Sequence, residues 1–380
     1  MEKTVKKIQM VDLKSQYEKI KTEVDAAIQN VLNNTAFING PEVKAFQSEM
    51  EAYLGAKHVI PCANGTDALQ IAMMALDLKP GDEVITADFT YVATAEVIAL
   101  LGLSPVLVDV VPDTFEIDVN AIEKAITPKT KAIVPVHLFG QCADMNKIMA
   151  LAKKHNLYVI EDTAQAIGAE YVYPDGTKKK AGTIGTIGCT SFFPSKNLGC
   201  YGDGGAIFTN DDALAAKIRM IANHGQSVQY VHDSIGVNSR LDSIQAAILR
   251  IKLRDLDNYA AARNKAAEYY DKAFANHPKL KTPARASFSN HVFHQYTLQL
   301  NGVDRNAFRD FLAGKDIPAM IYYPIPLHLQ KAYLDPRYKA GDFPVTEKLC
   351  DSVVSLPMHT ELDTETLKFI TDSVLEFLNK

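Results

Sequence analysis

Short runs of β-branched residues alternate with helix-like patterns through the first two-thirds of this 380-residue chain. Strand-like runs include "DEVITAD" at 82–88, "KAIVPVHLFG" at 131–140 and "LYVIEDTA" at 157–164. Several runs are nearly continuous in valine and isoleucine, which is typical of strands that are covered on both faces. The alternation therefore predicts an α/β fold with a mostly parallel sheet and helices on both faces.

From about Ser239 the pattern becomes helical, and after Pro283 strand-like and helix-like segments alternate over shorter distances. "HVFHQYTLQL" at 291–300 is strand-like, and a final helix is expected from about Asp363. We expect a smaller α+β C-terminal domain, and divide the chain into a large domain, 1–255, and a small domain, 256–380. "YVYPDGTKKKAG" at 171–182 predicts a hairpin with its lysines on a solvated edge.

Charge and composition exclude several classes of protein. The net charge of -5 leaves no basic excess, which argues against a nucleic-acid partner. The first ten residues lack an apolar signal region, and the most apolar stretch, 97–111, is interrupted by polar residues and a proline. Five scattered cysteines without CxxC spacing indicate neither a disulfide framework nor a metal site. We expect a cytoplasmic protein without a membrane segment.

A strand-to-helix junction lies in "CANGTDALQIA" at 62–72. The first N–H groups of a helix have no partner within the helix, so Gly65 and Thr66 can form a cup for a phosphate. The alternative is a plain helix start capped by Thr66 or Asp67.

Two acids, Glu161 and Asp162, follow the buried run in "YVIEDTAQAIGAEY" at 158–171. Ligands of parallel sheets collect at the carboxyl ends of strands, where a carboxylate can hold a protonated ring nitrogen. In the alternative, Asp162 caps a helix and Glu161 is solvated.

Lys196 lies in "SFFPSKNLGCYGDGGA" at 191–206, between an apolar strand and four glycines. Partial burial lowers the pKa of an ammonium group and favours the neutral amine that attacks a carbonyl. Ser191 can give its hydroxyl to a phosphate. The alternative is an ordinary surface lysine. A phosphate cup, a strand-end carboxylate and a buried lysine together match the needs of pyridoxal 5'-phosphate.

Four motifs in order make the chain similar to the DegT/DnrJ/StrS family of nucleotide-sugar aminotransferases, over nearly its whole length. They are "NGTDAL", "EDTAQAIGA", "SFFPSKNLGCYGDGGA" and "GVNSRLDSIQAAIL". The resemblance implies the aspartate-aminotransferase-like fold type I with a seven-stranded sheet. It also implies a homodimer whose active sites lie at the subunit interface.

The resemblance assigns a role to each of the motif residues. Lys196 is implied as the Schiff-base lysine and Asp162 as the partner of the pyridine nitrogen. The other implied cofactor contacts are Gln165 at the ring 3-oxygen, Tyr91 on the ring face, Gly65, Thr66 and Ser191 at the phosphate, and Asn238 at the phosphate of the other subunit. By residue type alone, Tyr91 is equally well a strand-end aromatic.

The lysine motif resembles that of relatives which aminate C3 of a sugar, with L-glutamate as the amino donor. The implied substrate is a UDP-2-acetamido-3-keto-glucuronate in surface polysaccharide (lipopolysaccharide) biosynthesis, and Arg240 is a candidate for its carboxylate. Tyr322 and Tyr323 replace the His-Tyr of many relatives on the substrate side. The alternatives are a structural ion pair for Arg240, amination at C4, and a regulatory protein that binds pyridoxal phosphate without catalysis.

Overall fold

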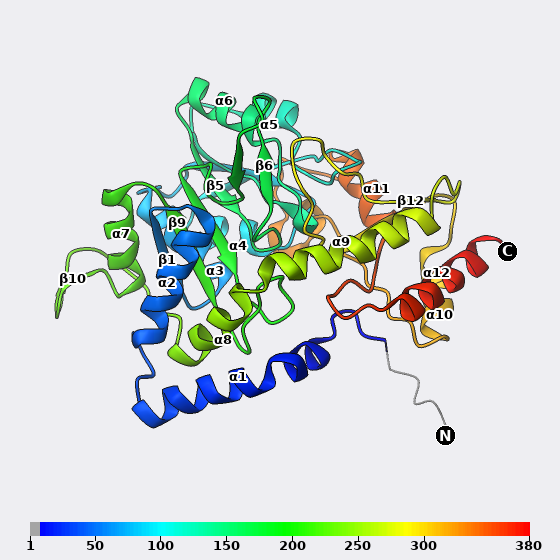
Figure 1. Cartoon of the computed structure of the whole chain (residues 1–380). Helices are drawn as coiled ribbons and strands as arrows, with labels where there is room; N and C mark the ends of the chain where they lie inside the picture. Colours follow the sequence, from blue (N-terminus) through cyan, green and yellow to red (C-terminus); the bar gives the residue numbers. More distant parts are fainter. Residues whose placement is uncertain (1–7) are drawn as a thin grey trace.

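The computed structural model describes residues 8–380, and residues 1–7 of the N-terminal segment considered above lie outside the described residues. A seven-stranded sheet forms the central layer (Figure 1). Its spatial order is β1-β9-β8-β5-β4-β2-β3, which confirms the predicted α/β fold. The strands are β1 (His58–Cys62), β2 (Glu83–Ala87), β3 (Ser104–Val108), β4 (Thr130–Val134), β5 (Tyr158–Asp162), β8 (Ile187–Ser191) and β9 (Gly205–Thr209).

One strand of this sheet runs against the others. β9 pairs in antiparallel fashion with both β1 and β8, whereas the pairs among β8, β5, β4, β2 and β3 are parallel. The register of β8 and β9 places Ser191 opposite Gly205. The segment that contains Lys196 therefore leaves the sheet at the end of β8 and returns beside that point at the start of β9.

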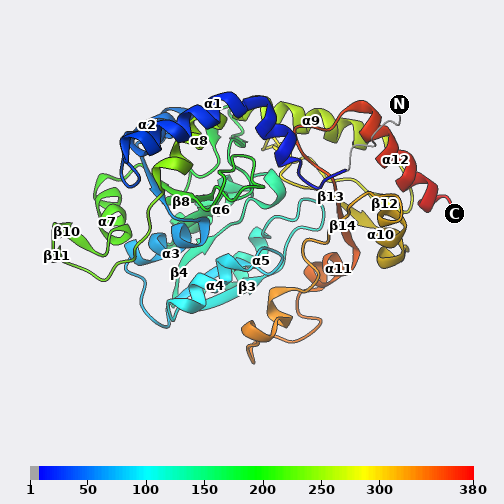
Figure 2. The same ribbon diagram turned by 90° about the horizontal axis from the view of Figure 1, so that it is seen from below.

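Helices cover both faces of the sheet, as the continuous apolar strands predict. Figure 2 shows α2 and α8 on one side and α3 on the other. One buried cluster joins α3, α4 and α7 to the strands, while two others lie beneath α2 and α8 and beneath α5 and α6. These helices are α2 (Pro41–Leu54), α3 (Gly65–Ala75), α4 (Ala93–Leu100), α5 (Val119–Ala125), α6 (Met145–His155), α7 (Asp212–Ala222) and α8 (Ser243–Leu253).

The C-terminal third has a core of its own beside a three-stranded antiparallel sheet of order β12-β13-β14. Side chains of α9, α10 and α12 pack on this sheet. Residues of α11 and of the segment 321–323 pack instead into a core cluster of the central sheet. The elements are α9 (Leu256–Ala273), β12 (Leu280–Lys281), β13 (Tyr296–Leu300), α10 (Arg305–Ala313), α11 (Pro344–Ser352), β14 (Val353–Leu356) and α12 (Thr364–Leu378).

Local details differ from the expectations in a few places. The helical pattern after Ser239 is two helices, α8 and α9, and only the second half of 291–300 is a strand. The predicted hairpin is present as β6 (Glu170–Val172) and β7 (Lys178–Lys180), but Lys180 is half-buried over the Tyr53 ring. The long helix α1 (Leu13–Asn34) was not predicted. Among residues 8–380, none of the helices combines the length and apolar character that a bilayer crossing requires.

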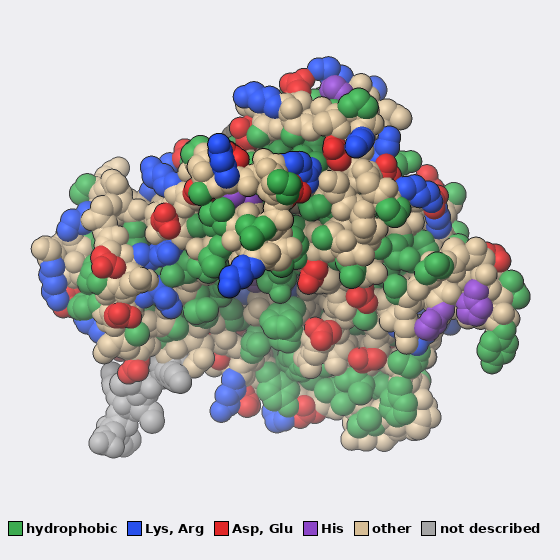
Figure 3. Space-filling view, turned by 180° about the vertical axis from the view of Figure 1, so that it is seen from behind, with side chains coloured by type: hydrophobic (Ala, Val, Ile, Leu, Met, Phe, Trp, Pro, Cys, Tyr) green, Lys and Arg blue, Asp and Glu red, His purple; other side chains and the backbone are tan. Residues whose placement is uncertain are grey.

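A second hairpin, β10 (Gln226–Val228) and β11 (Val231–His232), projects from the body of the molecule. It forms the arm at the right edge of Figure 3, whose tip carries apolar side chains. Tyr230 is 84% and Ile235 is 87% exposed, which is unusual for large apolar side chains of a monomer.

Candidate active site

A cavity of about 690 Å³ opens where β5 and β8 end and α3 begins. It is the place where ligands of open α/β sheets are expected, outside the carboxyl ends of the strands. Nine of the eleven predicted site residues line it: Gly65, Thr66, Tyr91, Asp162, Gln165, Ser191, Lys196, Tyr322 and Tyr323.

Helix α3 starts two residues earlier than a Thr66 cap would place it, because Asn64 caps it. The Asn64 Oδ1 atom accepts the Asp67 N–H at 2.8 Å, so the proposed caps Thr66 and Asp67 are both wrong. The first backbone bond of the helix runs from Ala68 N to Asn64 O. The N–H groups of Gly65 and Thr66 therefore precede the helical bonding pattern at the positive end of the helix dipole.

Gly65 packs directly against Ser191 at the end of β8. A β-carbon at position 65 would lie 2.6 Å from Ser191 Cβ, so only glycine permits this approach. The Ser191 hydroxyl accepts the Phe193 N–H at 3.2 Å, which leaves its own proton available. Two backbone donors and one hydroxyl donor thus converge on one wall of the cavity, as binding of a phosphate dianion requires.

Asp162 ends β5 and is only 6% exposed. Its Oδ1 accepts the Ala164 N–H at 3.0 Å, and its Oδ2 accepts the hydroxyl of Thr94 at 2.9 Å. Together the two bonds fix the orientation of the carboxylate. The carboxylate also acts on the amine of Lys196, whose charged form it favours.

The neighbouring Glu161 is fully buried, so the alternative in which it is solvated is wrong. Its carboxylate accepts the N–H groups of Gly182, Ile184 and Gly185 at 2.9, 2.7 and 2.5 Å. It also lies 2.9 Å from the Nε2 atom of buried His137. Adjacent strand residues point to opposite faces, which explains why one acid belongs to the cavity and the other to the core.

Lys196 projects into the cavity from the turn that follows Phe193. Burial lowers the pKa of its ammonium group to about 8, while the nearby Asp162 carboxylate acts in the opposite direction. Near neutral pH a sizeable fraction of the amine is therefore uncharged and nucleophilic. The alternative of an ordinary surface lysine is inconsistent with this position.

Gln165 and two tyrosines form the wall opposite the helix start. The Gln165 Oε1 atom accepts the Phe139 N–H at 2.8 Å, and its Nε2 donates to the Tyr323 hydroxyl at 3.0 Å. The rings of Tyr91 and Tyr323 lie 6.2 Å apart. Tyr91 is 55% exposed at the mouth of the cavity, so its ring is free to meet a ligand.

Asn238 and Arg240, the two remaining predicted residues, do not line this cavity. Asn238 is exposed and forms an isolated bridge with Asn223. Arg240 donates a hydrogen bond of 3.3 Å to Asn223 Oδ1, and Asp242 caps α8 instead of pairing with it. Both residues follow the projecting hairpin in the chain.

Sequence reasoning missed two polar residues of the site. Thr94 lies on α4 and holds Asp162, and it belongs to none of the four motifs. His294 lines the cavity with its Nδ1 buried and without a hydrogen-bond partner. Burial first, and then the charge of Lys196, lower the pKa of His294 well below its usual value, so its ring is neutral. The apolar pattern of 291–300 concealed it.

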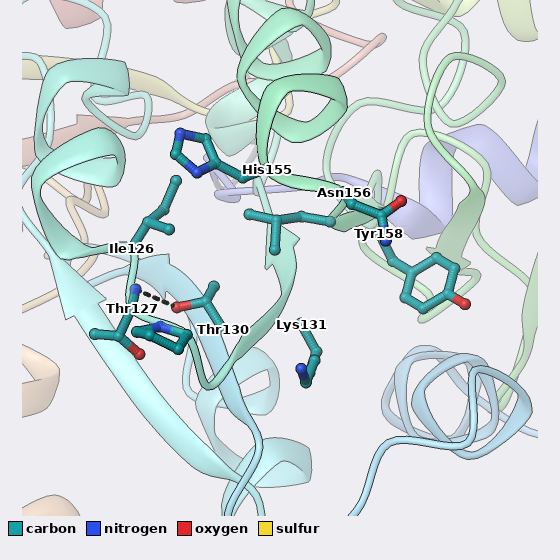
Figure 4. A pocket seen from close by; sticks show the side chains of 9 residues that line it. Ile126, Thr127, Thr130, Lys131, His155, Asn156 and Tyr158 are labelled. Atoms are coloured by element: carbon teal, nitrogen blue, oxygen red, sulfur yellow. Dashed lines mark hydrogen bonds between the residues drawn. The ribbon is translucent and has the colours of Figure 1, made fainter.

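A second hollow of about 670 Å³ lies elsewhere, where α6 leads into β5 and where β4 begins (Figure 4). Its side chains include Thr127, whose N–H donates to the Thr130 hydroxyl, and Lys131. None of the predicted site residues lies there.

Comparison with known proteins gives consistent matches over almost the whole chain. The profile of the DegT/DnrJ/EryC1/StrS aminotransferase family matches residues 18–375. A UDP-2-acetamido-2-deoxy-3-oxo-D-glucuronate aminotransferase from Pseudomonas aeruginosa is 49% identical over 96% of this chain and 98% of its own. A UDP-N-acetyl-3-dehydro-alpha-D-glucosamine 3-aminotransferase from Acidithiobacillus ferrooxidans is 44% identical over 98% of each.

A solved structure shows the same fold with a ligand. NtdA from Bacillus subtilis, described with bound cofactor PMP, superposes with a TM-score of 0.88 at 31% identity. The match covers 95% of this chain and 82% of that one.

Proposed function

This chain belongs to the DegT/DnrJ/EryC1/StrS aminotransferase family, and we propose that it transfers an amino group to a keto-sugar nucleotide with pyridoxal 5'-phosphate as cofactor. The observation that carries the proposal is the meeting of Asp162, Lys196 and the start of α3 in one cavity. Each of the three suits a different part of the cofactor: ring nitrogen, aldehyde carbon and phosphate.

The residues present fit that cofactor. Gly65 and Thr66 offer N–H groups, and Ser191 offers a hydroxyl, to the phosphate, and the cradle exists only because residue 65 has no β-carbon. When bound, pyridoxal phosphate supplies a conjugated ring that accepts the electron pair released as the amino group changes carbon. The buried Asp162 carboxylate would keep a proton on the ring nitrogen, and Gln165 would approach the ring 3-oxygen.

Lys196 has two tasks in this proposal. Its neutral amine binds the cofactor covalently, and the same amine, once released, carries a proton between carbon and nitrogen of the reacting group. A pKa of about 8 suits both tasks, because a group that titrates near the working pH gives and takes protons readily.

For the substrate, we propose the 3-keto group of a UDP-2-acetamido-3-keto-glucuronate and L-glutamate as donor, in surface polysaccharide synthesis. Two relatives that match this chain from end to end have names describing transfer to a 3-oxo or 3-dehydro UDP sugar. Arg240 is the proposed contact of the uronate carboxylate, because its planar fork of N–H groups can donate to both carboxylate oxygens.

We also propose a homodimer in which each cavity is completed by the partner. Asn238 and Arg240 lie outside the cavity of their own chain, next to the hairpin with exposed Tyr230 and Ile235. Apolar side chains also gather at the end of α1 and the segment after it, where Phe37 and Ile38 are 44% and 55% exposed. Docking of two such surfaces would bury these side chains and bring Asn238 to the phosphate of the partner site.

The direct test is a screen of keto-sugar nucleotides with glutamate, in which mass spectrometry detects the amino sugar and 2-oxoglutarate. We expect the UDP-linked 3-keto uronate to be converted with the highest kcat/KM. Exclusive conversion of a 4-keto sugar would refute the proposed position of amination. A colourless protein that binds no pyridoxal phosphate would refute the proposed enzyme altogether.

A further inference from the structure

The segment 320–330 connects the C-terminal core to the central sheet, and it carries Tyr322 and Tyr323 into the cavity wall. The Tyr323 hydroxyl is held by Gln165, and its ring lies 6.0 Å from that of Phe89. The Tyr323 ring also lies 6.2 Å from that of Tyr91, and residues 321–323 pack against the core cluster of the central sheet. Two fixed points flank the tyrosines. Backbone hydrogen bonds of 3.1 and 2.7 Å between Met320 and Ser355 precede them, and a buried contact at His328 follows Tyr323 by five residues.

Asp88 and His328 form a paired contact at this point, which we call the Asp88–His328 clamp. Asp88 Oδ1 accepts the backbone N–H of His328 at 2.8 Å, and Asp88 Oδ2 lies 2.6 Å from the ring atom Nδ1. The Leu327 N–H also donates to the Asp88 carbonyl at 3.3 Å. Both clamp side chains are completely buried.

The clamp joins two pieces of chain that each bring a tyrosine to the cavity. Asp88 follows β2 directly and precedes Tyr91 by three residues, while His328 follows Tyr323 by five. Neither clamp residue lines the cavity itself. The clamp therefore fixes the relative position of Tyr91 and Tyr323, whose rings lie 6.2 Å apart across the cavity wall.

The contact differs from ordinary packing because it contains a buried carboxylate, that of Asp88. A buried carboxylate without a partner is strongly destabilising, so Asp88 holds the segment only while both of its oxygens are satisfied. Burial raises the pKa of Asp88 to about 6, and the His328 N–H groups oppose that rise. The outer side of the ring is enclosed by Phe343, at 4.7 Å, and by Glu347, whose Oε1 lies 3.4 Å from Nε2.

We propose that Asp88 and His328 are positioning residues of the substrate site, which hold the Tyr322–Tyr323 segment against the cavity and so determine how tightly the sugar nucleotide is bound. The kinetic part of this inference rests on the proposed function. Its structural part concerns the segment alone and is tested without any substrate.

The first experiment measures amide hydrogen exchange of residues 320–330 and nitration of Tyr323 in the cofactor-free full-length protein. In His328→Phe both should rise by about ten- to a hundredfold, because the ring's bond to the Asp88 carboxylate is lost and only the backbone N–H bond remains. His328→Asn, whose amide N–H can replace Nδ1–H, should restore most of the protection. Tyr338→Phe is the matched control: it removes the hydroxyl that accepts the Leu107 N–H on the same lobe.

If His328→Phe does not fold, Asp88→Asn serves as the second variant, since it keeps the size of the side chain and places an amide NH₂ against the ring. Unchanged exchange and nitration in the folded variants would overturn the inference. Equal increases in exchange and nitration in Tyr338→Phe would overturn it as well, because the segment would then respond to the loss of any nearby hydrogen bond.

The second experiment separates KM from kcat in the holoenzyme. His328→Phe should raise the KM for the sugar nucleotide about tenfold and leave the covalent attachment at Lys196 intact. A normal KM beside faster exchange would reduce the clamp to a structural role and refute the positioning claim. If the parent protein converts no sugar, the proposed function fails, and exchange and nitration still decide whether the clamp holds the tyrosines.

Discussion

The hydroxyl of Thr94 on α4 donates a hydrogen bond of 2.9 Å to Asp162 Oδ2 at the end of β5. The carboxylate that is proposed to keep the cofactor's ring nitrogen protonated is thus oriented by a residue on a different element. Asp162→Asn should keep the fold and some bound cofactor and lower transamination by roughly several powers of ten, because the ring loses its electron-sink character. Thr94→Val is the matched variant, with an expected loss of about tenfold. Near-normal turnover in Asp162→Asn would reduce the carboxylate to a structural role.

The covalent attachment should be found on Lys196 alone. Borohydride reduction of the holoenzyme followed by peptide mapping should place the pyridoxyl group there. Lys252 is the informative control, because burial also lowers its pKa to about 8, while its Nζ donates to Gly199 O at 2.5 Å outside the cavity. A label on Lys252, or on any lysine other than Lys196, would contradict the assignment.

Cofactor uptake by the apoprotein should depend on pH with a midpoint near 8, the pKa of Lys196. Below that pH the amine is charged and does not attack a carbonyl, so the uptake rate should rise with pH and level off above it. Asp162 favours the charged form, and Asp162→Asn should therefore shift the midpoint to lower pH. A midpoint near 10.5 in either protein would show that the lysine is solvated.

The same pKa predicts how the stability of the apoprotein changes with pH. Because burial lowers the pKa of Lys196 from 10.5 to about 8, the folded state binds this proton less tightly than the unfolded chain does. The group therefore contributes increasing stability as pH rises from about 8 to 10.5. Urea denaturation at pH 8 and 10 should reveal this slope, and Lys196→Met should remove that part of it.

Mixing of two inactive variants tests whether each site is built from two subunits. Lys196→Ala lacks the amine of one site, and Asn238→Asp would place a negative charge beside the phosphate of the partner site. In a dimer with one chain of each variant, both changes fall in the same site and the other site is intact. Since random exchange makes about half of the dimers mixed, up to a quarter of the wild-type activity should return. No recovery in dimers shown by mass to be mixed would place Asn238 in its own subunit's site.

Arg240 should discriminate between sugars that differ at C6. If it pairs with a uronate carboxylate, Arg240→Lys should weaken use of the 3-keto uronate by a few kcal/mol more than use of the 6-hydroxymethyl analogue, since lysine lacks the planar fork. The comparison needs kcat/KM for both sugars in both proteins. Equal losses would mean that Arg240 supports the fold through Asn223, its hydrogen-bond partner here.

The sequence predicted most of the central sheet, because short continuous runs of valine and isoleucine are typical of strands that are covered on both faces. It also placed Gly65, Asp162 and Lys196 at or shortly after strands, and the structure brings the three to one cavity. It did not predict Thr94 or His294, because an inward-pointing polar residue within an apolar helix or strand pattern has no local signal. Their roles depend on which elements meet in space.

The same limitation explains the errors at Asn64 and Glu161. Asn, Thr and Asp are all good helix caps, so the choice among Asn64, Thr66 and Asp67 depends on backbone angles that side-chain types do not reveal. Glu161 is buried because a loop, 182–185, turns three N–H groups toward it. Such a loop has no periodic pattern, and its destination is visible only in the fold.

The antiparallel course of β9 limits how Lys196 can act. The chain leaves the sheet at Ser191 and returns opposite it at Gly205, so both ends of the intervening segment are secured by ladder bonds. Within it, Cys200 N–H donates to Phe192 O and Lys196 N–H to Phe193 O, at 2.8 Å each. These bonds hold the backbone on both sides of Lys196, so the four methylene groups of its side chain provide most of its freedom. In the proposed reaction the amine would then move about a fixed pivot and reach the bound group from one side only.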